Sequence, residues 1–223
     1  HYYGGTDGAS DLGWDWLDTR GDAASRLVAI ADFDLDGYPD LVWQNEATRQ
    51  VTVHYYGGFN GTEEQTSKSL YAAGAPGWRV VAAADFNGDG VPDLVWQNEA
   101  TRQVTVHYYG GPAGTVDQGF NWLYQGYAPG WKVVAVADFD GDGVPDLVWQ
   151  NEATRQVTVH YYGGVGGATE RSWRWLYPGS APGWSVVAAQ DFDGDGYPDL
   201  VWQADAVKQV TVHYYGGVEG ATD

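Results

Sequence analysis

A repeat of 53 residues constrains this chain more than any other feature of its sequence. The pentapeptide HYYGG begins at residues 1, 54, 107, 160 and 213, and an aspartate-rich segment begins at residues 32, 85, 138 and 191. Residues 91–111 and 144–164 are identical, and no linker separates the copies. A chain of this kind builds one structural unit several times and stacks the copies, so a repeat architecture is expected.

The repeats divide the chain into four similar tiles and the beginning of a fifth. With HYYGG as the start of each tile, the boundaries are 1–53, 54–106, 107–159 and 160–212, followed by a partial copy, 213–223. No low-complexity segment occurs anywhere in the 223 residues. We therefore expect residues 1–223 to form a single domain.

Each tile is predicted to contain four short strands. In the third and fourth tiles the first strand is expected from Val133 to Phe139, the second from Asp146, and the third in VTVHYYGG, from Val157. The fourth is expected in WLY at Trp175–Tyr177, with counterparts at 122–124 and 69–71. Alternating apolar residues, β-branched and aromatic enrichment, and Gly/Pro punctuation all indicate strands, and no helical periodicity competes.

These strands should be apolar on both faces. Leu147 and Trp149 are expected on one face of the second strand and Val148 on the other, while Val157 begins a similar alternation in the third. A sheet of this kind, repeated in tandem, needs a neighbour on each face, and radial stacking of four-stranded sheets is a β-propeller. We therefore predict an all-β propeller with four blades per chain, whose small residues 82–84 lie near the axis. A linear β-solenoid is the alternative, although its repeats are usually shorter.

The chain ends bear on how such a ring closes. Trp14–Asp18 reads as a fourth strand without the first and second strands before it, and the last tile has no fourth strand after Gly217. The two gaps complement each other, which makes His1–Gly5 redundant with His213–Gly217. Four blades could close alone, or two chains could exchange strands in an eight-bladed ring. We favour the homodimer, because four-bladed rings are uncommon.

The aspartate-rich segments have the spacing of a cation-binding loop. In DFDGDGVPD, from Asp138, carboxylates stand at positions 1, 3, 5 and 9, and a glycine stands at position 6. Calcium takes six to eight oxygen ligands, and a backbone carbonyl at position 7 would add one. The loops are no EF-hand, because position 12 is Trp149 and strands flank them. The predicted ligands are Asp32, Asp34, Asp36, Tyr38, Asp40, Asp85, Asn87, Asp89, Val91, Asp93, Asp138, Asp140, Asp142, Val144, Asp146, Asp191, Asp193, Asp195, Tyr197 and Asp199.

Calcium is expected at about one ion per repeat, in a structural role. An Asx-rich turn without an ion is the alternative reading, since Asp and Gly are common in turns. Fourfold recurrence of one spacing favours the ion, and a strict octahedron for magnesium does not need this many carboxylates. Asn87 replaces an aspartate in the second loop, which should therefore bind more weakly than its siblings.

The loop and the strand after it resemble a known repeat. DFDGDGxPDLVW followed by a hairpin is similar to the FG-GAP or VCBS-type repeat of integrin alpha-subunit propellers and many secreted bacterial proteins. The whole tile is most similar to repeats of calcium-binding fungal and bacterial propeller lectins. The resemblance implies seven-bladed propellers, calcium in the loops, extracellular location and glycan sites between blades. Four tiles depart from seven blades, and HYYGG matches no known sugar contact.

The residues give a binding function more support than catalysis. The histidines recur at one position of each tile, so no differentiated catalytic constellation emerges, and we expect no enzyme. These histidines read as strand residues rather than zinc ligands, although a ring of them at the axis is an alternative. Repeated aromatic residues suit weak multivalent binding of glycans. The candidate carbohydrate-binding residues are Trp78, Trp131, Trp184, Trp122, Trp175, Tyr124 and Tyr177, whereas Trp43, Trp96, Trp149 and Trp202 read as core.

Two other functions stay open at this stage. One is a non-catalytic structural or protein-interaction propeller, engineered or recently amplified, which the near-identity of the tiles favours. The other is a propeller attached to a lyase or hydrolase in a longer protein. The first tile has Ser25 where its siblings have Trp78, Trp131 and Trp184, so a site that uses this tryptophan should be missing there.

Composition narrows the partners. The net charge of −19 makes nucleic acid a poor partner, and 15 of the 30 acidic residues lie in the four loops. No apolar stretch is long enough to span a membrane. The chain has no cysteine, which excludes disulfides and thiolate metal sites. Loops that need abundant calcium agree with the secreted, extracellular location that the resemblance implies.

Overall fold

The computed structural model describes residues 2–4, 10–18, 23–217 and 220–221, and it confirms an all-β fold. The loop before β14 (Thr169–Tyr177) contains a single turn of 3-10 helix, Val165–Gly167. The strands are β1 (Tyr2–Gly4), β2 (Ser10–Gly13), β3 (Ser25–Ala31), β4 (Asp40–Asn45), β5 (Val51–Gly57), β6 (Glu63–Tyr71), β7 (Trp78–Ala84), β8 (Asp93–Asn98), β9 (Val104–Gly110), β10 (Val116–Tyr124), β11 (Trp131–Ala137), β12 (Asp146–Asn151), β13 (Val157–Gly163), β14 (Thr169–Tyr177), β15 (Trp184–Gln190), β16 (Asp199–Ala204) and β17 (Val210–His213).

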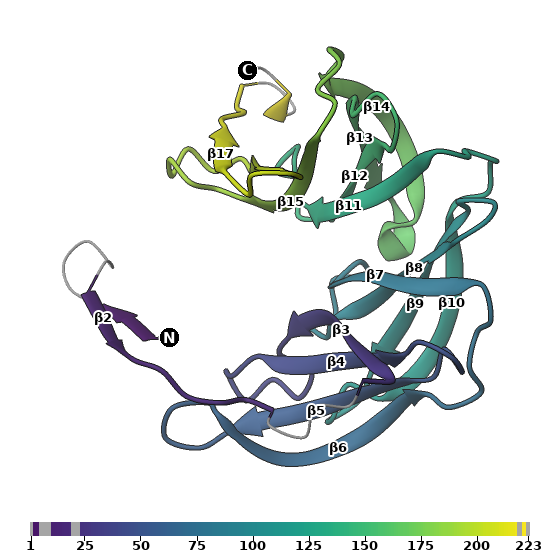
Figure 1. The fold of residues 1–223 in the computed structure, drawn as a ribbon. Coiled ribbons are helices and arrows are strands. Elements are labelled where there is room, and N and C mark those ends of the chain that lie inside the picture. The colour runs from purple at the N-terminus through teal and green to yellow at the C-terminus, as the bar shows by residue number, and fades with distance from the viewer. Residues whose placement is uncertain (1, 5–9, 19–22, 218–219, 222–223) are drawn as a thin grey trace.

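The strands form four antiparallel blades and a separate hairpin. Blade 1 is β3–β6, blade 2 is β7–β10, blade 3 is β11–β14, and each is a four-stranded meander. Blade 4 is the three-stranded sheet β15–β17, and β1 pairs with β2 in a hairpin of its own. Figure 1 shows the blades arranged around a common centre, as in a propeller, with the arc open between the hairpin and blade 4. The predicted propeller of four blades is therefore confirmed.

The first strand of each blade is the innermost one. β3 contacts β7, β7 contacts β11, and β11 contacts β15, so the inner strands follow one another around the centre. Together they border a hollow of about 540 Å³ whose lining includes Arg26, Arg79, Lys132, Val133 and Val186. The small residues 82–84 belong to β7, one of these inner strands, where they pack against the apolar clusters between blades.

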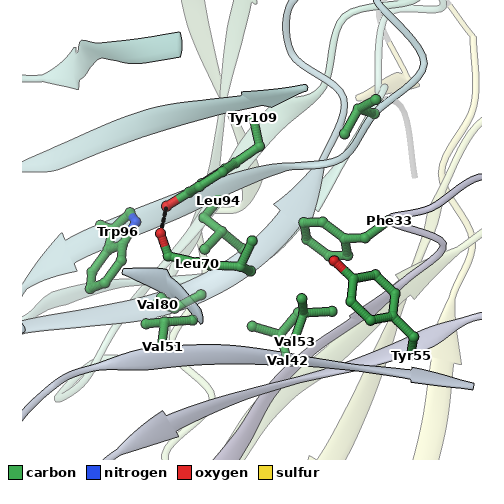
Figure 2. Close-up of a cluster of buried hydrophobic side chains, with 11 residues drawn as sticks. Phe33, Val42, Val51, Val53, Tyr55, Leu70, Val80, Leu94, Trp96 and Tyr109 are labelled. Atoms are coloured by element: carbon green, nitrogen blue, oxygen red, sulfur yellow. Dashed lines mark hydrogen bonds between the residues drawn. The ribbon is translucent and has the colours of Figure 1, made fainter. Parts of the chain in front are cut away.

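The core consists of three apolar clusters, one between each pair of neighbouring blades. Leu147 and Trp149 belong to the cluster between blades 2 and 3, whereas Val148 and Val157 belong to the one between blades 3 and 4. Figure 2 shows the first cluster, which combines Val42 and Val53 of blade 1 with Val80 and Leu94 of blade 2. The alternation predicted from the sequence therefore gives each blade two buried faces.

Polar contacts fix each blade against the next. The buried hydroxyl of Tyr109 donates to the carbonyl of Leu70 at 3.3 Å, a bond visible in Figure 2. The side-chain oxygen of Gln97 accepts from the amide of Val133 at 3.2 Å. Equivalent bonds recur at the other joints, together with ion pairs of 2.8–3.0 Å: Arg49–Glu99, Arg102–Glu152 and Arg155–Asp205. Because the same contacts repeat, each joint holds its two blades in a similar arrangement.

Three strand predictions need correction. The first strand of blade 3 runs from Trp131 to Ala137, and Phe139 lies beyond its end in the aspartate loop. The fourth strand is much longer than WLY: it runs over Thr169–Tyr177, and its first seven residues are exposed and mostly polar. Trp14–Asp18 is not a strand, because the short β1 pairs only with the preceding segment, Ser10–Gly13.

None of the helical structure in the described residues is long and apolar enough to cross a membrane. His1 and Gly5, which the sequence analysis treated as part of a redundant copy, lie outside the described residues, as does the end of the partial copy at 222–223.

Candidate functional site

The four aspartate loops connect the first and second strands of each blade, at one end of the sheet. In the third loop the carboxylate of Asp138 accepts hydrogen bonds from the amides of Gly141 and Gly143, both at 2.8 Å. Asp142 accepts in turn from the amide of Val144, the residue at position 7, at 2.8 Å. The loop backbone thus wraps around its first carboxylate, which holds the other acidic side chains nearby.

The aspartate at position 9 has a different environment. Asp146 is fully buried, and its two oxygens accept from the amides of Phe139 at 2.8 Å and Tyr162 at 2.9 Å. Burial and, to a smaller extent, the nearby charges of Asp140 and Asp138 raise the pKa of Asp146 to about 7, although these hydrogen bonds lower it. A carboxylate in such a place is stabilised in its charged form by a nearby cation.

Acidic groups in three loops lie close enough to hold one metal ion each. The ligand atoms lie within 4.8 Å of one another in each of three groups: Asp32, Asp34 and Asp36; Asp138, Asp140 and Asp146; Asp191, Asp193 and Asp199. One oxygen of Asp34 is buried without a hydrogen-bond donor, which is an unfavourable position for an oxygen unless a cation supplies the missing partner. Hard oxygen donors at this density fit calcium by their chemistry.

The loops differ in ways that affect ion binding. In the second loop, Asn87 stands at position 3 and accepts from the amide of Asp89 at 2.9 Å, so this loop has one charge fewer. In the third, the guanidinium of Arg171 contacts Asp142 and competes with a cation for its carboxylate. In the first, Leu35 adopts a positive φ of 60°, where the sibling loops have glycine.

An aromatic pocket lies on blade 3, with residues from all four of its strands and from the last strand of blade 2. Its cavity of about 240 Å³ is lined by Tyr124, Ala128, Trp131, Trp149, Thr158, His160, Trp173 and Trp175. Blade 2 has an equivalent pocket of about 220 Å³, lined by Tyr71, Ala75, Trp78, Trp96, Thr105, His107, Phe120 and Trp122. In blade 3 the structure therefore brings together three predicted residues, Trp131, Trp175 and Tyr124. In blade 2 it brings Trp78 together with Trp122, and the tyrosine there is Tyr71, which was not predicted as a binding residue.

The rings in these pockets are arranged in the same way in both blades. In blade 3 the rings of Trp131 and Trp175 lie 6.1 Å apart, and Trp173 stacks on His160 with centroids 6.2 Å apart. In blade 2 the corresponding stack is Phe120 on His107, at 5.2 Å. Each pocket therefore offers several ring faces around one imidazole.

The histidines belong to the pockets. His160 lies 3.0 Å from a carboxylate oxygen of Glu170, and His54 lies 3.0 Å from Glu64. Burial lowers the pKa of His107, which favours its neutral form. Within the described part of the chain no acidic metal cluster includes a histidine.

The pockets of blades 1 and 4 are incomplete. Blade 4 has a cavity of about 150 Å³ lined by Tyr177, Ala181, Trp184, Trp202, Thr211 and His213, without residues of a fourth strand. In blade 1 the lining is more polar than in blades 2 and 3, because Asp18 and Ser25 replace two of the aromatic residues. The predicted absence from this site of the tryptophan equivalent to Trp78 is consistent with Ser25 in its lining.

Sequence reasoning placed Trp149 and its equivalents in the core, and the structure shows that they are both core and pocket residues. Trp149 is only 2% exposed, and it still lines the cavity. The indole N–H groups of all four second-strand tryptophans are buried without an acceptor among the described residues, at a cost of about 1–3 kcal/mol each. Trp173 and Phe120 were missed, although an aromatic residue two positions before the predicted Trp175 and Trp122 was a usable signal.

Comparison with known proteins gives one family and two distant relatives. The model of the FG-GAP-like repeat matches residues 32–96 and 138–202, which together make up more than half of the chain. Each match begins at the first aspartate of one loop and ends in the second strand of the next blade. The matched segments therefore include all four aspartate loops.

The relatives are much longer than this chain. Phosphatidylinositol-glycan-specific phospholipase D of Rattus norvegicus is 32% identical over an alignment that covers 56% of this chain and 18% of the phospholipase. Among solved structures, a rhamnogalacturonan lyase of Bacillus licheniformis superposes with a TM-score of 0.47 at 13% identity, over 89% of this chain and 41% of the lyase. The chain thus spans less than half the length of either protein, and a structural likeness this weak carries no argument about function.

Proposed function

This chain belongs to the FG-GAP-like repeat family, and from that premise we propose that it is a calcium-stabilised propeller that binds carbohydrates at several equivalent sites outside the cell. The observation that carries the proposal is the recurrence of one aromatic pocket, with the same ring arrangement, in blades 2 and 3. A protein that presents the same small pocket more than once is suited to a repetitive ligand.

The chemistry of the pockets suits a sugar. Ring faces such as those of Trp131 and Trp175 can pack on the C–H surface of a pyranose, while Thr158 and His160 offer hydrogen-bonding groups for its hydroxyls. Cavities of 220–240 Å³ are smaller than the roughly 300–1,000 Å³ typical of drug-sized ligands, so one or two sugar units would fill each. Simultaneous binding at several pockets would raise the overall affinity by about 10²–10⁴ over a single site.

The role proposed for calcium is structural. The carboxylates of each loop would hold one ion, which would neutralise their mutual repulsion and fix the turn between the first and second strands. The position-9 aspartate supports this role, because Asp146 also accepts hydrogen bonds from the amide of Phe139 in the same loop and from the amide of Tyr162 in β13. An ion beside it would therefore stabilise the joint between strands as well as the loop. Sites that need abundant calcium favour the proposed extracellular location.

We infer no catalytic activity for these residues. The acidic clusters lie in the loops, and the titratable groups of the described pocket in blade 3 are one histidine with a glutamate partner and one tyrosine. Hydrolysis or elimination needs differentiated groups around one reacting centre. Repetition of nearly equal pockets is better suited to binding, whatever other domains a longer parent protein carries.

A glycan array with calcium present tests the proposal. We expect binding to a restricted set of glycans, lost by at least tenfold in the double variant Trp78→Ala/Trp131→Ala. Tyr127→Ala is the matched control, because Tyr127 is an exposed aromatic residue outside the pocket linings. Absence of binding to every glycan by a folded, calcium-loaded protein would contradict the proposal and favour the protein-interaction propeller.

A further inference from the structure

The segment Trp14–Leu17 already sits against blade 1 as the fourth strand of a preceding blade would. The hydroxyl of Tyr56 donates to the carbonyl of Leu17 at 2.9 Å. The same bond joins each blade to the fourth strand before it: Tyr109 to Leu70 at 3.3 Å, Tyr162 to Leu123 at 3.0 Å and Tyr215 to Leu176 at 3.1 Å. The hairpin and the segment after it therefore occupy the place of the outer strands of a blade next to blade 1.

The register of the hairpin supports this assignment. β1 pairs with β2 as the third strand of a blade pairs with its fourth. The pairs Tyr2–Gly13, Tyr3–Asp11 and Gly4–Ser10 correspond, 159 residues earlier, to Tyr161–Ser172, Tyr162–Glu170 and Gly163–Thr169. The hairpin thus has the outer half of a blade, and blade 4 has the first three strands of one.

Blade 4 exposes the face that every other blade buries. Each of three apolar positions is covered in blade 3 and open in blade 4. From blade 3 to the equivalent residue of blade 4, the exposed fraction of the side chain rises from 0% at Phe139 to 55% at Phe192, from 0% at Val157 to 59% at Val210, and from 1% at Tyr161 to 54% at Tyr214. A contiguous apolar face of this kind marks an interaction surface.

Blade 1 exposes the complementary face. Leu27 is 38% exposed, whereas its equivalents Val80, Val133 and Val186 are buried in the clusters between blades. Trp43 is likewise the one second-strand tryptophan of the four that is only partly buried. The two ends of the arc therefore carry the two halves of one more joint between blades.

The segment after the hairpin carries the two side chains that the pocket of blade 4 lacks. Trp14 and Trp16 occupy the repeat positions of Trp173 and Trp175, and they form a similar edge-on pair with centroids 5.8 Å apart in both places. In register with β17, Trp14 would stack on His213 and Trp16 would contact Trp184. Both tryptophans are mostly exposed in the single chain.

The geometry favours a second copy of the chain over closure within one chain. Leu17 is held on blade 1, and Figure 1 shows the hairpin and β17 on opposite sides of the opening. Contacts join each inner strand to the next, but no comparable contact joins β15 to β3 in the described residues. Closure of the ring within one chain would change the angle between neighbouring blades and break the hydrogen bonds and ion pairs that every joint shares. Two arcs related by a two-fold axis can complete one ring with these joints unchanged.

We propose that two copies of this chain form one ring of eight blades, in which Trp14–Leu17 of each copy becomes the outer strand of the other copy's blade 4 and completes its aromatic pocket. Each joint between the two copies has the same contacts as the joints between blades within one chain. Gln203 faces the amide of Leu27 as Gln150 faces that of Val186, and Lys208 pairs with Glu46 as Arg155 pairs with Asp205. Tyr215 already occupies its place in blade 4, so β1, which duplicates residues 214–216, leaves the hairpin on assembly.

The proposal needs no ligand, so its test is independent of the proposed function. Light scattering after size exclusion should give twice the chain mass of 24.3 kDa, and a single-chain mass would overturn it. Phe192→Asp should convert the dimer to a folded monomer, judged by an unchanged circular dichroism spectrum. Tyr127→Asp, an exposed aromatic residue away from both closing faces, should leave the dimer intact.

A disulfide distinguishes the two ways of closing the ring. Asp15 and Val212 occupy the repeat positions of the paired residues Arg174 and Val159, and the chain has no other cysteine that could interfere. In the double variant Asp15→Cys/Val212→Cys, oxidation should link most chains into dimers on non-reducing gels, and the single variants should give no such ladder. A disulfide within one chain would show that the ring closes alone, and a dimer without any disulfide would show that another surface joins the copies.

Discussion

Leu35 gives the sharpest test of how the aspartate loops are built. It is the residue at position 4 of the first loop, and its φ of 60° lies in the left-handed region. The sibling residues are Gly88, Gly141 and Gly194, with φ of 75–79°. A side chain in this region costs about 1–2 kcal/mol, because Cβ approaches the backbone carbonyl. The first loop therefore adopts the shared conformation at a cost that the other three avoid.

Leu35→Gly should consequently stabilise the protein. The relief of about 1–2 kcal/mol is offset by the greater freedom of glycine in the unfolded chain, about 0.5–1 kcal/mol. Leu35 is 56% exposed, so little apolar burial is lost. We expect a net gain of about 0.5–1 kcal/mol, which raises the melting temperature by about 1–4 °C for a chain of this size.

Calorimetry in the presence of calcium, with two control variants, separates the backbone effect from removal of an exposed leucine. Leu35→Ala removes the same side chain but keeps Cβ, so it should bring no gain. Gly141→Leu places the leucine in the third loop, where an added Cβ meets no atom within 4 Å, and should lower stability by a similar amount. If Leu35→Ala stabilises as much as Leu35→Gly, the argument from φ is wrong.

Three further outcomes are expected. Removal of calcium by a chelator should lower the melting temperature by several degrees, and an unchanged temperature would mean that the loops bind no ion that matters for folding. In chelator the melting temperature should fall as the pH rises from 5 to 8. The folded-state pKa of Asp93 and of Asp146, about 7 each, lies above the unfolded value of about 3.9, so the stabilisation that protonation gives is lost over this range. Calcium should reduce that fall, and a melting temperature that rises with pH would contradict the burial argument. Tyr162→Phe should destabilise by about 1–3 kcal/mol in chemical unfolding, because the buried carbonyl of Leu123 loses its donor, whereas Tyr127→Phe at an exposed position should change stability by less than about 0.5 kcal/mol.

Much of the blade was readable from the sequence because its signals are local. Val157 and its neighbours alternate with period two, and the structure buries both faces as that pattern requires. The outer strand was mostly missed, since the first seven residues of Thr169–Tyr177 are exposed and therefore free to be polar. Residues on an edge strand carry little apolar pattern, so its length is set by pairing with Val157–Gly163 rather than by its own composition.

The pockets were predictable only in part, for a different reason. Trp131 and Trp175 stood out as repeated aromatic residues, but the sequence does not say which residues of neighbouring strands meet in space. Trp149 reads as core by its place in an apolar strand, and it is both buried and part of the pocket. The histidine acquires its role only when the fourth strand brings Trp173 beside it.

The joints between blades have a genetic consequence. Each uses partners at fixed distances along the chain, such as 39 residues from Leu123 to Tyr162 and 50 from Arg102 to Glu152. Unequal recombination between the identical stretches 91–111 and 144–164 would add or delete one whole 53-residue unit in frame, and every surviving joint would find its usual partner at the usual distance. A gain or loss of one unit therefore changes the number of blades per chain without changing how neighbouring blades pack against each other.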